Sequence, residues 1–134
     1  MSAVLVGYVP SPEGRAALDA GVEEARRRGV RLVVVNTTRG DALVDQRYVQ
    51  GAAADDLRAE LEGLDLPAEL QQLGDGRDVA EELDALAAEL DADVVVIGLR
   101  HRSPVGKLIL GSAASRILLT VRRPVLAVKV RTDQ

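Results

Sequence analysis

Four short segments of the chain are almost continuously apolar instead of alternating between apolar and polar residues. Continuous apolar runs are typical of strands buried on both faces of a parallel sheet, and the Val and Ile residues that dominate these runs favour extended backbone. We therefore predict strands at Ala3–Val9, Leu32–Val35, Val94–Ile97 and Val125–Val128. A fifth segment, Ala68–Leu73, is less apolar and is predicted to be a strand at an edge of the sheet.

Between the strands, apolar residues recur with the period of an amphipathic helix. Ser11 and Pro12 form a helix start, with a capping side chain and a proline in the first turn, and Gly29 ends that helix. The same reasoning predicts a loop at Thr38–Gln50 and three more helices, at Gly51–Leu61, Val79–Leu90 and Ala113–Val121.

Strands and helices therefore alternate along the whole chain. Such alternation predicts right-handed crossovers and an α/β fold, with an open five-stranded parallel sheet covered by helices on both faces. A chain of 134 residues fits one hydrophobic core. We expect a single domain over residues 1–134.

Composition narrows the classes of function. The chain has no Cys, which excludes disulfides, thiolate metal sites and thiol catalysis and favours a cytoplasmic location. No apolar run approaches the roughly 20 residues that span a bilayer, so no membrane is expected as a partner. With two Tyr and no Trp or Phe, the chain cannot form a base-stacking platform, and no nucleic acid is expected either.

Charge is distributed unevenly along the chain. Residues 1–98 contain 20 acidic and 9 basic residues, whereas residues 99–134 contain 8 basic residues and a single acidic one. A basic segment on an acidic protein does not suit a broad nucleic-acid surface, but it suits a small anionic ligand.

The most informative segment, residues 98–115, directly follows the fourth apolar strand. Gly111 and Ser112 precede a predicted helix whose free N–H groups would favour an anion. The glycines of the segment are expected to permit close backbone approach and positive φ, and they are Gly98, Gly106 and Gly111. Its basic side chains are Arg100, Arg102 and Lys107. We expect a phosphate cradle here.

This segment resembles the glycine motif of the nucleotide-binding branch of the universal stress protein family. That motif is Gly, two residues, Gly, nine residues, Gly and then Ser or Thr, and a Pro-Val-Leu-x-Val strand follows it. Gly98, Gly111 and Ser112 fill their places, and Pro124–Val128 matches the closing strand. The long spacing after a buried strand is far more specific than a lone Gly-rich loop.

The resemblance covers essentially the whole chain and carries several implications. It implies strand order 3-2-1-4-5, an adenine-nucleotide α-hydrolase-like fold, and ATP or another adenine nucleotide at the carboxyl ends of the first and fourth strands. The residues that it places around the phosphates are Gly98, Gly111, Ser112, Ala113 and Ser115, with charge from Arg100, His101 or Arg102.

Two positions depart from the family pattern. His101 stands at the second motif glycine, where its side chain would crowd the phosphates or, turned outward, contact them. Val9, followed by Pro10, stands where ATP-binding members carry Asp, and Val cannot accept a hydrogen bond from a ribose or adenine. Asn36, at the end of the second strand, would supply one polar contact to the base.

Several charged residues also have a plain structural interpretation. A lone histidine such as His101 is typically a solvated loop residue. Arg100, Arg102 and Lys107 are interpreted either as solvated loop charges or as phosphate ligands. We expect Arg122 and Arg123 to complement the carboxyl end of the last helix. A solvated helix face is predicted for Glu81, Glu82 and Asp84.

The resemblance implies a stress-response regulator or sensor rather than an enzyme. The sequence has no nucleophile elbow, no second His for a triad and no P-loop. One alternative is a nucleotide-independent dimeric interaction module, which Val9 and His101 favour, and a weaker one is a slow ATPase. The apolar edge strand Pro124–Val130 would pair antiparallel with a second copy in a homodimer, as in the family.

Overall fold

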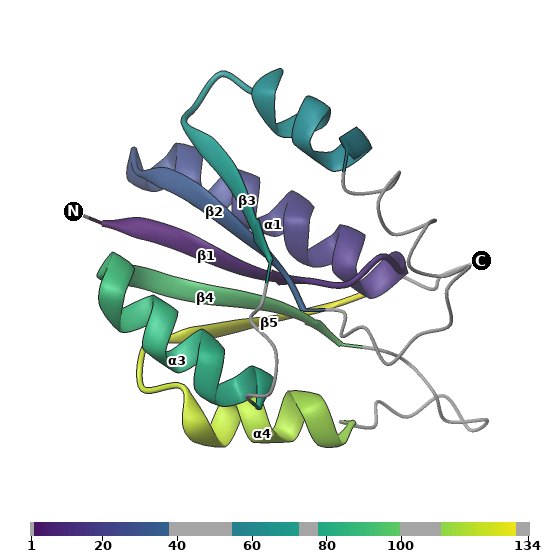
Figure 1. Ribbon diagram of the computed structural model, residues 1–134, viewed down its shortest axis with the longest axis vertical. Helices are drawn as coiled ribbons and strands as arrows, with labels where there is room; N and C mark the ends of the chain where they lie inside the picture. The colour runs from purple at the N-terminus through teal and green to yellow at the C-terminus, as the bar shows by residue number, and fades with distance from the viewer. Residues whose placement is uncertain (1, 38–54, 73–77, 100–110, 131–134) are drawn as a thin grey trace.

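A five-stranded, fully parallel sheet forms the centre of the computed structural model, which describes residues 2–37, 55–72, 78–99 and 111–130. The strand order is β3-β2-β1-β4-β5 (Figure 1), which confirms the expected fold class and order. The strands are β1 (Ala3–Tyr8), β2 (Arg31–Asn36), β3 (Ala68–Gln72), β4 (Ala92–Leu99) and β5 (Val125–Lys129).

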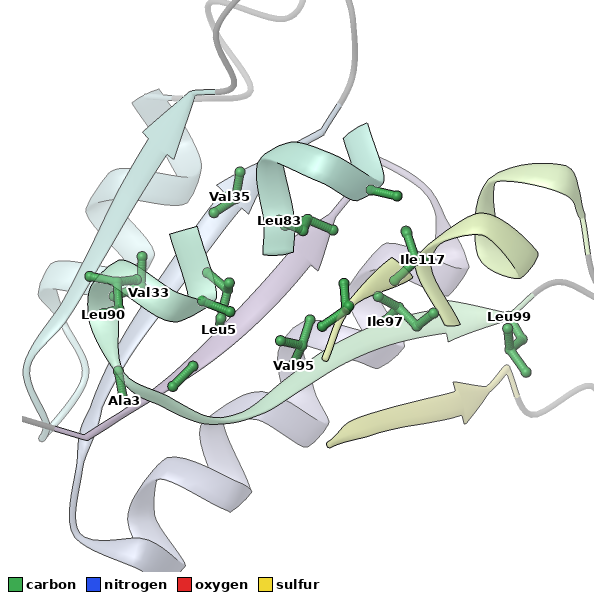
Figure 2. Close-up of a cluster of buried hydrophobic side chains, with 14 residues drawn as sticks. Ala3, Leu5, Val33, Val35, Leu83, Leu90, Val95, Ile97, Leu99 and Ile117 are labelled. Carbon is green, nitrogen blue, oxygen red and sulfur yellow. The ribbon is translucent and has the colours of Figure 1, made fainter. Parts of the chain in front are cut away.

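Helices cover both faces of the sheet. Helix α1 (Pro12–Arg28) and the helical residues 55–62 pack on one face, against Val4, Val6 and Val34 among others. Helices α3 (Val79–Leu90) and α4 (Ser112–Thr120) cover the other face. Figure 2 shows Leu83 and Ile117 pointing from these two helices toward the side chains of β1 and β4.

Local signals determine where the helices begin and end. The Ser11 side chain accepts a hydrogen bond from the Gly14 N–H at 3.2 Å, and the Asp78 side chain accepts one from the Glu81 N–H at 3.3 Å. Helix α1 ends at Gly29, whose φ of 68° is left-handed and therefore suits glycine. None of the helices in the described ranges combines the length and apolarity needed to cross a bilayer.

The element boundaries differ slightly from those expected. Strand β1 ends at Tyr8, so Val9 lies just beyond it, and β4 is longer than the run Val94–Ile97. Strand β3 lies at an edge, as predicted. The predicted loop Thr38–Gln50 lies outside the described residues.

Arginine–aspartate pairs join α3 to α4 and to the turn that follows it. Arg122 donates from its backbone N–H at 3.0 Å and from its guanidinium at 3.0 Å to Asp84, and Arg123 pairs with Asp91 at 3.0 Å. The solvated role expected for Asp84 is therefore wrong, because its side chain is 17% exposed and paired with Arg122. These side chains meet because α3 and α4 lie side by side.

Candidate functional site

A cavity of about 650 Å³ opens at the carboxyl ends of β1 and β4. Residues from the first turns of α1, α3 and α4 border it. The N-termini of these three helices lie toward this end of the sheet (Figure 1). The residues around it are Gly7, Val9, Glu13, Gly14, Thr37, Val79, Ile97, Gly98, Leu99, Gly111, Ser112, Ala113, Ala114 and Ile117.

The position of the cavity follows from the topology. The chain leaves β1 toward β2 on one side, while β4 joins β1 on the other side, so the winding direction reverses between β1 and β4. Ligands of open parallel sheets bind in the crevice at this reversal. The location expected from the sequence is therefore where the structure has its cavity.

Among the described residues, no side chain caps the N-terminus of α4, which borders the cavity. Its N-cap residue, Gly111, makes no side-chain hydrogen bond to the first turn, whereas Ser11 and Asp78 cap α1 and α3. Ser112 and Ala113, whose N–H groups belong to the first turn, border the cavity. The N–H groups of the first turn and the helix dipole make this end of α4 suited to an anion.

The two described motif glycines have different surroundings. A Cβ at Gly98 would lie 2.0 Å from the Glu13 carbonyl oxygen, so glycine is needed there for α1 to pack on β4. A Cβ at Gly111 would meet nothing within 4 Å, and its φ of −72° is open to other residues. Neither Gly98 nor Gly111 has the positive φ that the sequence led us to expect. In the described part of the chain, positive φ occurs at Gly29 and Asp91.

The opposite wall of the cavity is formed by residues after β1 and β2. Val9 borders the cavity, and its carbonyl oxygen would lie 1.7 Å from a Cβ at Gly14, so the first turn of α1 packs closely on it. Thr37 donates to the Tyr8 carbonyl from its N–H at 2.8 Å and from Oγ1 at 3.0 Å. Most of the side chains that line the cavity are apolar, which suits the faces of a flat ring.

The structure brings together only some of the predicted site residues. Val9, Gly98, Gly111, Ser112 and Ala113 border the cavity. Pro10 is exposed and lies outside the lining. Asn36 is 8% exposed and also lies outside it.

Ser115 does not line the cavity, and its N–H donates instead to the Gly111 carbonyl at 3.0 Å, within the first turn of α4. Arg100, His101 and Arg102 lie outside the described residues, as do Gly106 and Lys107.

Sequence reasoning missed several residues of the site. Glu13 and Gly14 enter it through the first turn of α1, and Thr37 enters it as the residue after β2. The helix start at Ser11-Pro12 was the available signal for the first two, because it places a first turn beside the end of β1. Thr37 could have been found as the first residue beyond a buried strand.

A charged pair lies beside the cavity lining. Arg116 of α4 donates from Nε at 3.2 Å and from Nη2 at 2.9 Å to the carboxylate of Asp78, which caps α3. The guanidinium holds the pKa of Asp78 below its ordinary value, and Asp78 in turn raises the pKa of Arg116. Both groups therefore carry their charges at neutral pH.

Comparison with known proteins identifies relatives over nearly the whole length. The model of the universal stress protein family matches residues 1–129. A universal stress protein of Mycolicibacterium smegmatis is 48% identical over 126 residues, which cover 94% of this chain and 96% of that protein.

Solved structures share the fold. A universal stress protein from Archaeoglobus fulgidus superposes with a TM-score of 0.78 at 30% identity, covering 96% of this chain and 98% of that one. A structure from the same organism, in complex with dAMP, superposes with a TM-score of 0.71 at 24% identity and with the same coverage.

Proposed function

This chain belongs to the universal stress protein family, and from that premise we propose that it is a stress-response sensor or regulator that binds an adenine nucleotide. The nucleotide phosphates would lie at the N-terminus of α4, and the nucleoside would lie between the carboxyl ends of β1 and β4. We propose that it acts in the cytoplasm, where adenine nucleotides are abundant, and that it binds them without turnover.

The observation that carries this proposal is the open N-terminus of α4. In the part of the chain that the structure describes, its first-turn amides have no side-chain cap, and their residues border a cavity large enough for a small ligand. The N-termini of α1 and α3 are capped by their own side chains, so α4 is better suited than they are to a phosphate. The dAMP complex of the Archaeoglobus fulgidus protein supports an adenine nucleotide as the ligand class.

The nucleoside half of the site offers few polar groups. Val9 cannot accept a hydrogen bond from a ribose, and the Thr37 hydroxyl donates its proton to Tyr8. Apolar contact with Ile97 and Leu99 would hold the base chiefly by burial of its faces. We therefore expect phosphate number, more than base identity, to determine the affinity.

Substitution of Gly111 by Asp tests the phosphate position. A carboxylate there would cap α4 itself, occupy the amides that would hold a phosphate and repel it, so ATP and AMP should bind at least about tenfold more weakly. There is room for the side chain, because a Cβ at Gly111 meets nothing within 4 Å. Titration calorimetry with ATP, ADP and AMP would measure the affinities.

Gly111→Asn is the matched control, because Asn caps a helix about as well as Asp but adds no charge. It should lose less affinity than Gly111→Asp, and both variants should melt at or slightly above the wild-type temperature. Equal nucleotide affinity of Gly111→Asp and wild type would contradict a phosphate at α4.

A nucleotide-independent dimeric interaction module is the second candidate. It is favoured by Val9 at the nucleoside position and by strand β5, which pairs with β4 and lies at an edge of the sheet. Leu126 on that strand is 36% exposed. Absence of wild-type binding at millimolar nucleotide would favour this candidate, and phosphate release from ATP in the same samples would identify a slow ATPase instead.

A further inference from the structure

Arg116 and Asp78 form a charged pair between the first turns of α4 and α3. The carboxylate of Asp78 accepts two bonds from the guanidinium while it also accepts the Glu81 N–H that caps α3. The capping bond holds the carboxylate in place at the start of α3. The carboxylate in turn fixes the guanidinium, although the Arg116 side chain is 56% exposed.

The pair lies at the end of both helices that faces the cavity. Arg116 follows Ser112 by one helical turn and Ala113 by three residues, and both of those residues border the cavity. Arg116 and Asp78 themselves lie just outside the cavity lining. Helical side chains lean toward the N-terminus of their helix, which agrees with a guanidinium held at Asp78, at the start of α3. Asp78 directly precedes Val79, which borders the cavity from α3.

The guanidinium retains donors for a second anion. Arginine has five N–H donors in a planar fork, and the two bonds to Asp78 use Nε and Nη2. Nη1 takes part in neither bond. Arginine suits phosphate because its fork matches two phosphate oxygens.

We propose that Arg116 is a phosphate-binding residue of this site and that Asp78 is the carboxylate that it neutralises there. The inference rests on the proposed function. Arg116 has a second role in the same arrangement, because it neutralises a carboxylate that would otherwise repel the phosphate. The amides of α4 and the guanidinium would then hold the same phosphate from two sides.

Variants of Arg116 and Asp78 distinguish a role in phosphate binding from a purely structural role of the ion pair. Arg116→Gln removes the cation and leaves Asp78 unneutralised, so AMP should bind about tenfold or more weakly. Asp78→Asn breaks the same ion pair but keeps the cap and removes the repulsion, so AMP affinity should stay within about twofold or rise. The double variant should lose less affinity than Arg116→Gln alone.

The readout is the ratio of AMP to adenosine affinity, measured by NMR titration at low and high salt. Adenosine lacks the phosphate, so Arg116→Gln should lower this ratio. Arg116→Lys, which keeps the charge but not the fork, should lower it less than Arg116→Gln does. Arg122→Gln is the matched control. It breaks the ion pair between Arg122 and Asp84, which lies beyond the other end of α4, and it should leave the ratio unchanged.

The outcomes distinguish this inference from the proposed function. Wild type that binds neither AMP nor adenosine overturns both. Wild type that binds AMP while Arg116→Gln keeps the same ratio overturns the role of Arg116 alone. Equal effects of Arg116→Gln and Asp78→Asn on the ratio would show that the pair is only structural and would likewise overturn it.

Discussion

Gly98 has a packing role that is independent of any ligand. Its missing side chain lets the Glu13 carbonyl of α1 approach β4, which brings the first turn of α1 to the cavity. Gly111 in the same motif meets no such neighbour. The glycine at position 98 is therefore explained by packing alone and is not evidence for a ligand, whereas packing does not explain the glycine at position 111.

Gly98→Ala should destabilise the protein by about 1–3 kcal/mol, because the new methyl group meets backbone that cannot move aside without shifting α1. Gly111→Asn should change stability by less than about 1 kcal/mol, since the position is open and Asn caps helices well. Urea unfolding followed by circular dichroism would measure both. A Gly98→Ala variant as stable as wild type would show that α1 can move away from β4.

At the scale of elements, α4 is the most weakly embedded of the described helices. Ile117 is its one buried residue, and Leu119 is 88% exposed. Its attachment to α3 relies on Ile117 and on the arginine–aspartate pairs at both ends of α4. The helix that carries the proposed phosphate site is thus held partly by charge.

Acid should weaken the attachment of α4. The Arg122 N–H and guanidinium lower the pKa of Asp84, so this pair contributes stability above the ordinary Asp pKa of about 3.9. That contribution is lost as pH falls through the lower pKa of the folded protein. We therefore expect Asp84→Asn to lower the melting temperature at pH 7 and the difference from wild type to shrink by pH 3.

Thermal melts followed by circular dichroism at both pH values would measure this difference. Glu89→Gln is a suitable control, because it removes an exposed carboxylate from the same helix. An Asp84→Asn effect of equal size at pH 3 and pH 7 would be inconsistent with a charge-based attachment.

At the scale of the whole molecule, β5 leaves half of its backbone groups facing away from the sheet. The Val95 N–H donates to the Pro124 carbonyl at 2.9 Å, and Val95 lies opposite Val125. In this register the backbone groups of residues 124, 126 and 128 face β4, and those of residues 125, 127 and 129 face outward. A second copy could pair with the outward groups, as we propose for a homodimer.

Ala127→Pro tests that homodimer without breaking the sheet within one copy. Proline at 127 removes an outward N–H, so the dimer should dissociate to a folded monomer in light scattering, with a modest loss in melting temperature. Val128→Pro is the contrasting variant, because it removes a donor to β4 and should destabilise the chain itself. A stable Ala127→Pro dimer would place the interface elsewhere.

Much of the fold could be predicted because its signals are local. The apolar runs of β1, β2 and β4, the helix start at Ser11 and the left-handed end at Gly29 each depend on a few adjacent residues. Parallel crossovers then leave few topologies. The sequence alone therefore determined the α/β class, the order of its elements and the end of the sheet at which a ligand would bind.

Only the tertiary structure decided which side chains meet. Asp78 and Arg116 are 38 residues apart, as are Asp84 and Arg122, and no local pattern predicts these partners. They meet because two amphipathic helices cover the same face of the sheet. The same packing places the Glu13 carbonyl on Gly98 and brings Thr37 into the cavity. Contacts between distant segments depend on the packing of whole elements, which the sequence of either segment does not contain.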